Sequence, residues 1–152
     1  MQTHRRSVLK KMLASLAGIT GIGVAARATD EAPEKESSNI VYHQDVPLFA
    51  GNTKWRRLVF IAGKGAHFQG DIKAHTDHVL KELEKELIAA GSSMKKVLKV
   101  TVYLNDIADY KAMNETYQGR FGDKPPVRST VAVAKGGVPG DSLVEMDCIA
   151  YI

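Results

Sequence analysis

Two charged residues in the C-terminal part of the chain could together bind and hydrolyse a small carboxylic acid. Arg128 opens a strand-like segment just after two prolines, and Glu145 lies in the apolar segment 143–149. The planar guanidinium group of arginine can hold a carboxylate through two parallel hydrogen bonds. A glutamate in a partly desolvated cleft can position a water molecule for attack. From spacing alone, a surface ion pair for Arg128 and a solvated strand face for Glu145 are the simpler interpretations.

Three histidines supply the ligand type that zinc commonly takes in proteins. His75 and His78 are three residues apart in a segment of helical periodicity, and His67 closely precedes them. The H-E-x-x-H pattern of zinc proteases is absent, and the single cysteine, Cys148, cannot form a cysteine-rich zinc set. We therefore expect exposed helical histidines and no metal site. Cys148 lies in an apolar terminal segment, where we expect a buried and unreactive thiol.

A lysine between two glycines is a further candidate for binding an anion. Lys64 is flanked by Gly63 and Gly65, and glycines allow a ligand to come close to the main chain. The G-x-x-x-x-G-K-[ST] spacing of a phosphate-binding P-loop is absent, so we do not expect nucleotide binding.

The positive charge of the chain is concentrated at its N-terminal end. The 152 residues include 21 Lys and Arg against 17 Asp and Glu, a formal net charge of +4. Five of the basic residues and none of the acidic residues lie in residues 1–28, so residues 29–152 have 16 basic and 17 acidic residues and a net charge of −1. A charge-driven nucleic-acid interface is therefore not expected in the main part of the chain.

Residues 1–28 have the order of a bacterial export signal. A basic start that contains Arg5 and Arg6 leads into the apolar residues 12–26, and residues 26–28 (Ala-Arg-Ala) match a cleavage site. The paired arginines resemble a twin-arginine (Tat) signal peptide. We expect export to the periplasm or the cell exterior, with no stable membrane association after the signal is removed. A basic amphipathic tail and retention of the segment as an anchor are the alternatives.

Residues 29–39 are expected to be a flexible linker, because they contain one alanine and no larger aliphatic or aromatic residue. The domain then covers residues 40–152.

Asp71 predicts the start of a first helix, and Gly91 predicts its end. A second helix is expected to be capped by Asp109. The pattern predicts helices at 72–90 and 109–121 and strands at 49–51, 58–62, 97–104, 127–134 and 143–152.

The predicted order ββαβαββ favours an α+β fold with a mixed sheet and both helices packed on one face. A chain of this size can form one hydrophobic core. The sheet face without helices would be apolar and open, and such a face usually packs against another subunit.

Several short motifs follow one another in a characteristic order: Gly63 after an apolar strand, Ala89-Ala90-Gly91, Asn105-Asp106, Asp109-Tyr110, Asn114-Glu115-Thr116-Tyr117, Pro126-Val127-Arg128-Ser129 and Leu143-Val144-Glu145-Met146-Asp147. None of these is diagnostic alone. Their order and spacing, from about Phe60 to Ile152, resemble the RidA/YjgF family of reactive-intermediate deaminases, which are also called endoribonuclease L-PSP-like proteins.

The resemblance implies a chorismate-mutase-like fold, a homotrimer, and ligand sites in the clefts between subunits. It also implies hydrolysis of enamine or imine intermediates, such as 2-aminoacrylate, to a 2-keto acid and ammonia. No metal or organic cofactor is implied, and the partners would be a small carboxylate substrate and further copies of the chain.

Site residues follow from the same resemblance, position by position. Arg128 matches the arginine that grips the substrate carboxylate, and Glu145 matches the glutamate that positions the attacking water. Further substrate-binding positions are Gly63, Lys64, Asn114, Thr130 and Phe49. Several positions depart from the family pattern: Phe49 replaces a tyrosine, Thr130 a cysteine, Ala62-Gly63-Lys64 a Ser-Gly-Gln triplet, and His75 a frequent glutamine.

Two other functions remain open at the level of sequence. A non-enzymatic periplasmic protein that binds small ligands would have the same fold and cleft, and the departures at Phe49, Ala62 and Lys64 favour it. A role in RNA binding or cleavage is disfavoured by the net charge of −1 over residues 29–152. Turnover of an imino acid distinguishes the enzyme from the binding protein.

Overall fold

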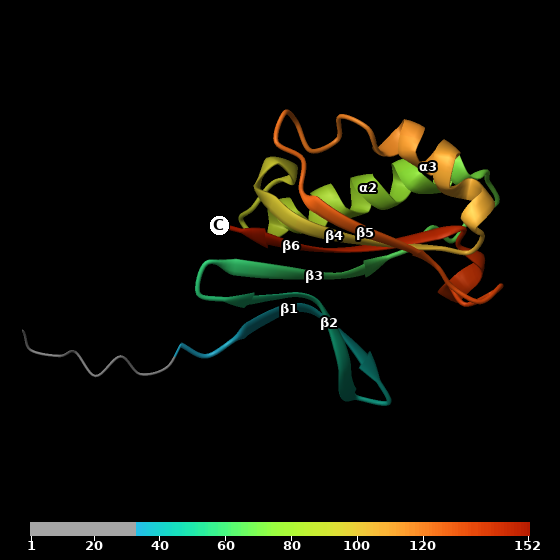
Figure 1. The fold of residues 1–152 in the computed structure, drawn as a ribbon. Helices are drawn as coiled ribbons and strands as arrows, with labels where there is room; N and C mark the ends of the chain where they lie inside the picture. The colour runs from blue at the N-terminus through green and yellow to red at the C-terminus, as the bar shows by residue number, and fades with distance from the viewer. Residues whose placement is uncertain (1–32) are drawn as a thin grey trace, which may run out of the picture. The chain divides into compact units, whose positions relative to one another are not determined.

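A mixed six-stranded sheet carries two helices on one of its faces (Figure 1). The structure, a computed structural model, describes residues 33–152. The predicted signal peptide and the first four residues of the predicted linker lie outside this range. The elements are β1 (Glu36–His43), β2 (Val46–Trp55), β3 (Leu58–Lys64), α2 (Ile72–Ala89), β4 (Val97–Leu104), α3 (Tyr110–Tyr117), β5 (Val127–Ala132) and β6 (Val144–Tyr151), with 3-10 turns at Met94–Lys96, Ile107–Asp109 and Pro139–Asp141.

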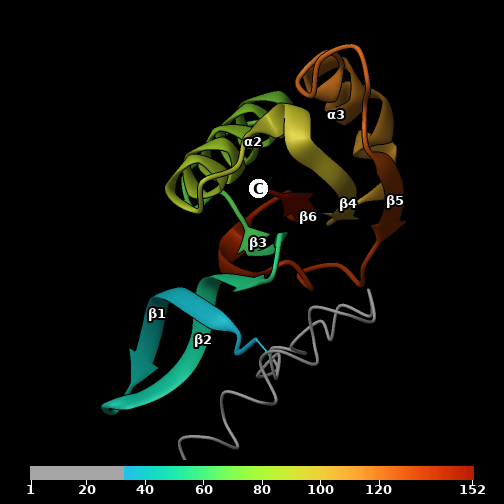
Figure 2. The same cartoon turned by 90° about the vertical axis from the view of Figure 1, so that its left-hand side faces the viewer.

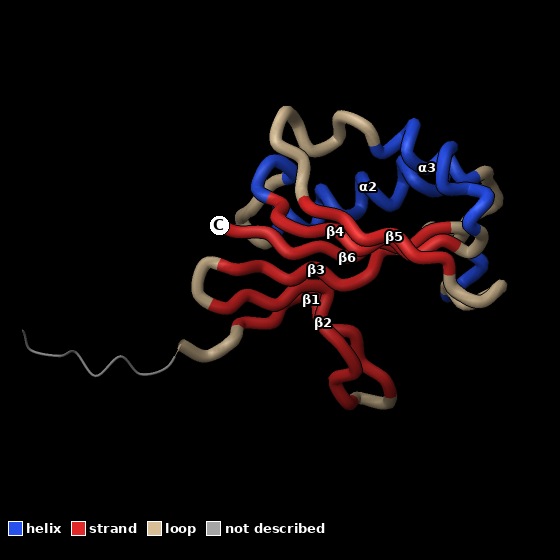
Figure 3. The backbone as a smooth tube through the Cα atoms, viewed as in Figure 1, coloured by secondary structure: helices blue, strands red, loops and turns tan. Residues whose placement is uncertain are grey.

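The strand order is β1-β2-β3-β6-β4-β5, and β4 and β5 form the parallel pair. A parallel connection needs a crossover, which α3 supplies between these two strands. The C-terminal strand β6 lies in the middle of the sheet, antiparallel to both β3 and β4. Figures 2 and 3 show α2 and α3 on the same side of the sheet. The structure therefore confirms the predicted chorismate-mutase-like α+β fold.

Helix α2 begins and ends where the sequence predicts. The Asp71 side chain accepts a hydrogen bond of 2.8 Å from the backbone N–H of Ala74, which caps the N-terminus. At the other end Gly91 has a φ of +83°, and the backbone N–H of Ser92 donates to the carbonyl of Leu87. This is the Schellman arrangement, which favours glycine at the left-handed position. The residues of the stripe that packs on the sheet are all buried: Ile72, His75, Thr76, Val79, Leu80, Leu83 and Leu87.

The two faces of the sheet have opposite roles. Alternate residues of β4 and β6, among them Val102 and Met146, are completely buried beneath the helices. On the opposite face, Phe60, Val131 and Tyr151 are 39–47% exposed. Among residues 33–152 no segment covers this second face, which is called the open face below.

The predicted linker is wrong over residues 36–39, which form the first half of β1. Strands β1 and β2 make a long hairpin that stands off from the rest of the domain in Figures 1 and 2. Its turn is built by Gln44 and Asp45, with φ of +48° and +64°. Glycine or asparagine usually marks such a turn, so the hairpin had no clear sequence signal. A register shift between Val41 and Tyr42 interrupts β1.

Helix α3 is shorter than predicted and ends at Tyr117. Gln118 adopts an extended ψ of 133°, and Gly119 and Gly122 then take positive φ, so the chain turns before Phe121. The predicted cap also differs. Asp109 makes no side-chain cap, whereas the Asp106 carboxylate accepts a 2.9 Å bond from Ala108 N–H in the turn just before the helix.

Within residues 33–152 no helix is both long and apolar enough to span a lipid bilayer.

Candidate functional site

Glu145 and Gly63 lie directly against each other on neighbouring strands. Glu145 is paired with Tyr103 of β4 and projects from the open face of the sheet. The pairing of β3 with β6 is irregular between Ile61 and Lys64, which brings Gly63 beside the carboxylate. A Cβ atom at position 63 would lie 2.8 Å from Glu145 Cδ and closer still to Oε1. The structure thus brings two of the predicted site residues together.

Arg128 projects from the other face of the sheet, toward the helices. It is paired with Val100, a residue buried beneath the helix layer. The Arg128 Cζ atom lies 4.6 Å from the centre of the Tyr117 ring, and Nη2 donates a 3.3 Å hydrogen bond to Tyr110 Oη. None of the ion pairs formed between residues 33 and 152 involves Arg128. Its charge is therefore available to an anion from outside this chain.

The sheet itself separates Arg128 from Glu145 within one chain. The two residues occupy opposite faces and lie two strands apart, with β4 between β5 and β6. Within one copy the hydrogen-bonded strands β4 and β6 therefore lie between the two side chains.

Thr130 and Asn114 lie near Arg128 in the fold. Thr130 follows Arg128 by two residues on β5, so both side chains project from the same face. Its buried Oγ1 atom has no hydrogen-bond partner within residues 33–152. Asn114 shares one side of α3 with Tyr110 and Tyr117, four residues after the first and three before the second. Both residues are thus placed where a ligand held by Arg128 could reach them.

Lys64 is engaged inside the chain. Its Nζ atom lies 3.0 Å from Oε2 of Glu86 on α2, and the two side chains are 20% and 12% exposed. Glu86 Oε1 also accepts hydrogen bonds of 2.6 Å from the side-chain amides of Asn39 and Asn52. One carboxylate therefore joins α2 to β1, β2 and β3. The negative charge of Glu86 also balances the positive charge of Lys64, the residue next to Gly63.

The environment of Glu86 favours its ionised form. Burial by itself raises the pKa of the Glu86 carboxyl. The hydrogen bonds from Asn52, Lys64 and Asn39, together with the positive charge of Lys64, outweigh burial and leave the pKa below its usual value. Glu86 is therefore a partly buried anion that Asn39, Asn52 and Lys64 stabilise.

His75 does not lie exposed on the helix as predicted, whereas His67 is exposed and His78 is partly exposed. His75 is only 2% exposed. Its Nδ1 atom accepts a 3.1 Å bond from Leu143 N–H, and its Nε2 atom lies 2.9 Å from the Phe68 carbonyl, to which it must donate. His67 contacts the Gly140 carbonyl instead. Within residues 33–152 no three His, Cys, Asp or Glu side chains gather as a metal site would require.

His75 and Ser142 together fix the segment that leads into the Glu145 strand. Ser142 Oγ accepts a 2.8 Å bond from Ala66 N–H and donates a 2.6 Å bond to the Val144 carbonyl. These bonds and those of His75 tie the loop after β3 to the start of β6. They therefore hold Gly63 and Glu145, which lie at the ends of these segments, in a fixed relation.

Cys148 is buried, as predicted. Burial raises the pKa of its thiol to about 12, so the sulfur stays protonated at neutral pH. The cysteine therefore belongs to the core beneath the helices and takes no part in nucleophilic chemistry.

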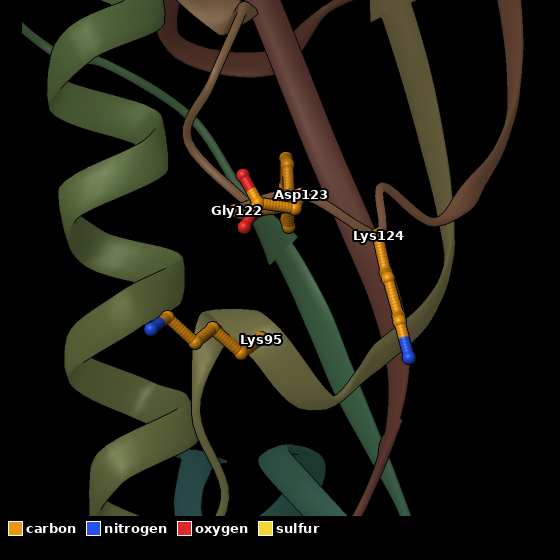
Figure 4. A pocket seen from close by; sticks show the side chains of 5 residues that line it. Lys95, Gly122, Asp123 and Lys124 are labelled. Atoms are coloured by element: carbon orange, nitrogen blue, oxygen red, sulfur yellow. The ribbon is translucent and has the colours of Figure 1, made fainter.

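Two hollows of the described surface are lined by neither Arg128 nor Glu145. One, of about 340 Å³, is lined by Lys95, Phe121, Gly122, Asp123 and Lys124 (Figure 4). Another, of about 230 Å³, lies along the β1–β2 hairpin and includes Phe49, which is 55% exposed. Phe49 is thus placed in a different part of the chain from the other predicted site residues.

Three residues of this region were not singled out as functional from the sequence. Tyr110 and Tyr117 fall on a helical stripe typical of a core helix, and the contact with Arg128 gives them a second role. Glu86 looks like any charged residue on an exposed helix face. Its partners Asn39 and Asn52 lie on β1 and β2. Nothing in the sequence pattern connected these strands with α2.

The mixed six-stranded sheet and its two helices define a domain of the YjgF type. The family model described as Endoribonuclease L-PSP matches residues 33–152. The chain belongs to this family, which is the RidA/YjgF family.

Individual relatives agree with this assignment. The chain is 39% identical over 121 residues to 3-aminoacrylate deaminase RutC of Acinetobacter baylyi, covering 79% of this chain and 85% of that protein. It is 35% identical over 106 residues to the chloroplastic Reactive Intermediate Deaminase A of Arabidopsis thaliana, covering 65% and 56%. A solved structure of a YjgF/YER057c/UK114 family member from Mycobacterium tuberculosis superposes with a TM-score of 0.62 at 31% identity, covering 68% of this chain and 86% of that one.

Proposed function

We propose that this protein hydrolyses small enamine or imine intermediates that carry a carboxylate, of the 2-aminoacrylate type, to a 2-keto acid and ammonia. The observation that carries the proposal is the Arg128 guanidinium, which is held by two tyrosines and forms no ion pair within residues 33–152. The relatives described as deaminases support the same reaction class. The substrate is thus defined by a carboxylate next to a C=N bond.

Glu145 supplies the water chemistry in this proposal. The enamine first tautomerises to the imine. A water oxygen then forms a bond to the imine carbon while Glu145 accepts one water proton, and this proton passes to the nitrogen to give a carbinolamine. The hydroxyl proton of this intermediate passes to the amino group as the C–N bond breaks, so that ammonia leaves and the ketone forms. Since the imine is already electrophilic, holding the carboxylate and positioning the water provide useful acceleration.

The site is proposed to lie between copies of the chain in a homotrimer. The position of Arg128 and Glu145 on opposite faces of one sheet supports this arrangement. The exposed apolar residues of the open face, such as Phe60 and Val131, supply surface for the contact. Arg128 of one copy and Glu145 of a neighbour would then reach the same cleft.

The direct test is an assay of iminopyruvate hydrolysis. An amino-acid oxidase generates the imine, and ammonia and pyruvate release are followed above the rate in water. We expect Arg128→Ala to lower kcat/KM by at least about 100-fold, because the carboxylate loses its charged partner. The trimer should persist by light scattering. Unchanged turnover in this variant would overturn the proposal.

A non-enzymatic role in ligand binding is the second candidate. It is favoured by Phe49, which lacks a hydroxyl group and lies on the exposed hairpin, and by the internal pairing of Lys64. Pyruvate binding that depends on Arg128, without acceleration of imine hydrolysis over a panel of imino acids, would establish this role instead.

Export by the Tat route is proposed for the full chain on the basis of its first 28 residues. Substituting Arg5 and Arg6 by lysine should leave the protein in the cytoplasmic fraction, because the twin arginines are the recognised feature. Unchanged recovery in the periplasm would exclude Tat export.

A further inference from the structure

Arg128 contacts two tyrosines, which a carboxylate site does not itself require. We propose that Tyr110 and Tyr117 are positioning residues that hold the Arg128 guanidinium in one orientation, with one edge turned outward to receive a carboxylate. The inference rests on the proposed function only in taking a carboxylate as the ligand. The tyrosines touch the arginine rather than the reacting atoms, so their role is indirect.

Tyr117 supplies a rigid surface for the guanidinium plane. Its side chain is only 9% exposed, and its ring packs 5.0 Å from the ring of Phe121. Burial raises the pKa of Tyr117 to about 12, against the opposing effect of the Arg128 charge, so the ring stays neutral. With Arg128 Cζ 4.6 Å above the ring centre, the contact combines stacking with a cation–π attraction.

Tyr110 fixes the rotation of the guanidinium within that plane. Its hydroxyl oxygen accepts a hydrogen bond of 3.3 Å from Arg128 Nη2. Arginine offers five N–H donors, and this bond engages one of them. An edge with two parallel N–H groups remains for a bidentate carboxylate. Tyr110 and Tyr117 are both on α3, seven residues apart on one side of the helix, so a single rigid element sets both contacts.

The arrangement matters because arginine has a long and flexible side chain. An unrestrained guanidinium loses side-chain entropy when it closes on a ligand, and this loss weakens binding. In many proteins a neighbouring carboxylate orders the arginine, but it would also neutralise the charge. Here no ion pair within residues 33–152 involves Arg128. Two neutral aromatic side chains order the cation and leave its charge to the ligand.

The hydroxyl groups of the two tyrosines provide a matched pair of variants. Tyr110→Phe removes the oxygen that contacts Arg128 and keeps the ring. Tyr117→Phe removes a buried hydroxyl that has no partner within residues 33–152 and keeps the stack. Tyr117→Leu removes the stack itself. If Tyr117 had a purely structural role, both substitutions at position 117 would act by lowering the stability of the protein. If Tyr117 positions Arg128, only the substitution that removes the ring should disturb Arg128.

The experiment measures pyruvate binding by calorimetry and the order of the Arg128 side chain by NMR relaxation of its Nε–H group, in the assembled protein. We expect Tyr110→Phe to weaken pyruvate binding by about 3- to 10-fold, the effect of one hydrogen bond. Tyr117→Leu should weaken it by about 3- to 30-fold through loss of the cation–π contact. Both should lower the Nε–H order parameter and raise KM with little change in kcat. Tyr117→Phe keeps the ring and should therefore keep the Nε–H order parameter of the parent.

The outcomes separate this inference from the proposed function. Parent-like Nε–H order in both Tyr110→Phe and Tyr117→Leu overturns the positioning role, whatever the assay shows. Where Arg128→Ala itself weakens pyruvate binding, lower order accompanied by unchanged pyruvate binding in the tyrosine variants also overturns it, because the orientation would then have no consequence. If Arg128→Ala binds pyruvate like the parent while the tyrosine variants disorder Arg128, the proposed function fails. The ordering of Arg128 by Tyr110 and Tyr117 then remains as a local feature of the fold.

Discussion

Gly63 lies so close to Glu145 that the carboxylate occupies the space where any other residue would place its side chain. A Cβ atom at position 63 would be 2.8 Å from Glu145 Cδ. The glycine is therefore required by its neighbour on β6, and its own φ is not in the left-handed region. The irregular pairing between β3 and β6 creates this close approach.

We expect Gly63→Ala to move the Glu145 side chain and lower kcat/KM by about 100-fold, the typical effect of a displacement near 1 Å at a reacting group. The cost in stability should be about 1–3 kcal/mol, as for other overpacked sites. Imine hydrolysis and urea unfolding measure the two effects. Gly136→Ala is a suitable control, because a Cβ there would meet nothing within 4 Å, although its φ of +76° adds some strain. Normal activity in Gly63→Ala would show that the position of Glu145 is unimportant.

Arg128 and Glu145 should complement each other between copies of the chain. Arg128→Ala and Glu145→Gln are each expected to be inactive alone. After refolding together in equal amounts, about one quarter of sites shared between neighbours in a ring would contain both native groups. Activity near that fraction of the parent is the expected result of the iminopyruvate assay.

The control for this mixture is Arg128→Ala refolded with the Arg128→Ala, Glu145→Gln double variant. No chain in this second mixture has an arginine at position 128, so it should stay inactive. If the first mixture is also inactive while both proteins assemble normally, the two residues do not share a site between copies.

The two hydrogen bonds of His75 should be reproduced by glutamine but not by an apolar residue. A glutamine amide can donate to the Phe68 carbonyl and accept from Leu143 N–H, as the imidazole does. We expect His75→Gln to change the free energy of unfolding by less than about 1 kcal/mol and His75→Leu to lower it by about 2–4 kcal/mol, because two backbone groups lose their partners. Chemical denaturation provides the comparison, and equal losses in the two variants would contradict this account.

The Glu86 cluster should make the protein sensitive to acid. Because the pKa of Glu86 is lowered in the folded state, its contribution to stability is present above the value of an unfolded glutamate, near pH 4.3. That contribution is lost as the pH falls through the lower pKa of the folded state. We expect Glu86→Gln to be less stable by about 1–3 kcal/mol at pH 7.

The same variant should lose less stability than the parent between about pH 5 and pH 3. Urea unfolding at several pH values in this range tests the difference. Glu84→Gln on the same helix is the matched control, since Glu84 forms no ion pair with another residue of 33–152. Parallel pH profiles of the parent and Glu86→Gln would show that Glu86 does not carry the effect.

The helix and strand pattern of the central domain could be predicted because local signals agreed with the tertiary structure. Asp71 and Gly91 mark the ends of α2, and alternation in β4 predicts its buried face. The β1–β2 hairpin gave no such agreement. The residues of β1 are exposed throughout, so buried and exposed residues do not alternate along this strand. The turn at Gln44 and Asp45 also has no glycine.

The candidate site could be predicted only as a set of residues. Motif order identified Arg128 and Glu145, but their positions on opposite faces depend on the insertion of β6 between β3 and β4. The burial of His75 likewise depends on Leu143, which lies 68 residues further along the chain. Such long-range pairings are set by topology and leave no periodic trace in the sequence.

The interrupted register of β1 has a consequence for how copies of the chain associate. A long, regular edge strand offers a continuous row of main-chain groups and invites open-ended strand addition. In β1 the shift between Val41 and Tyr42 and the positive φ of Asn39 break this row into short pieces. The apolar hairpin can therefore associate through its faces, while growth along its edge is blocked. Concentrated protein should form closed assemblies and no fibres.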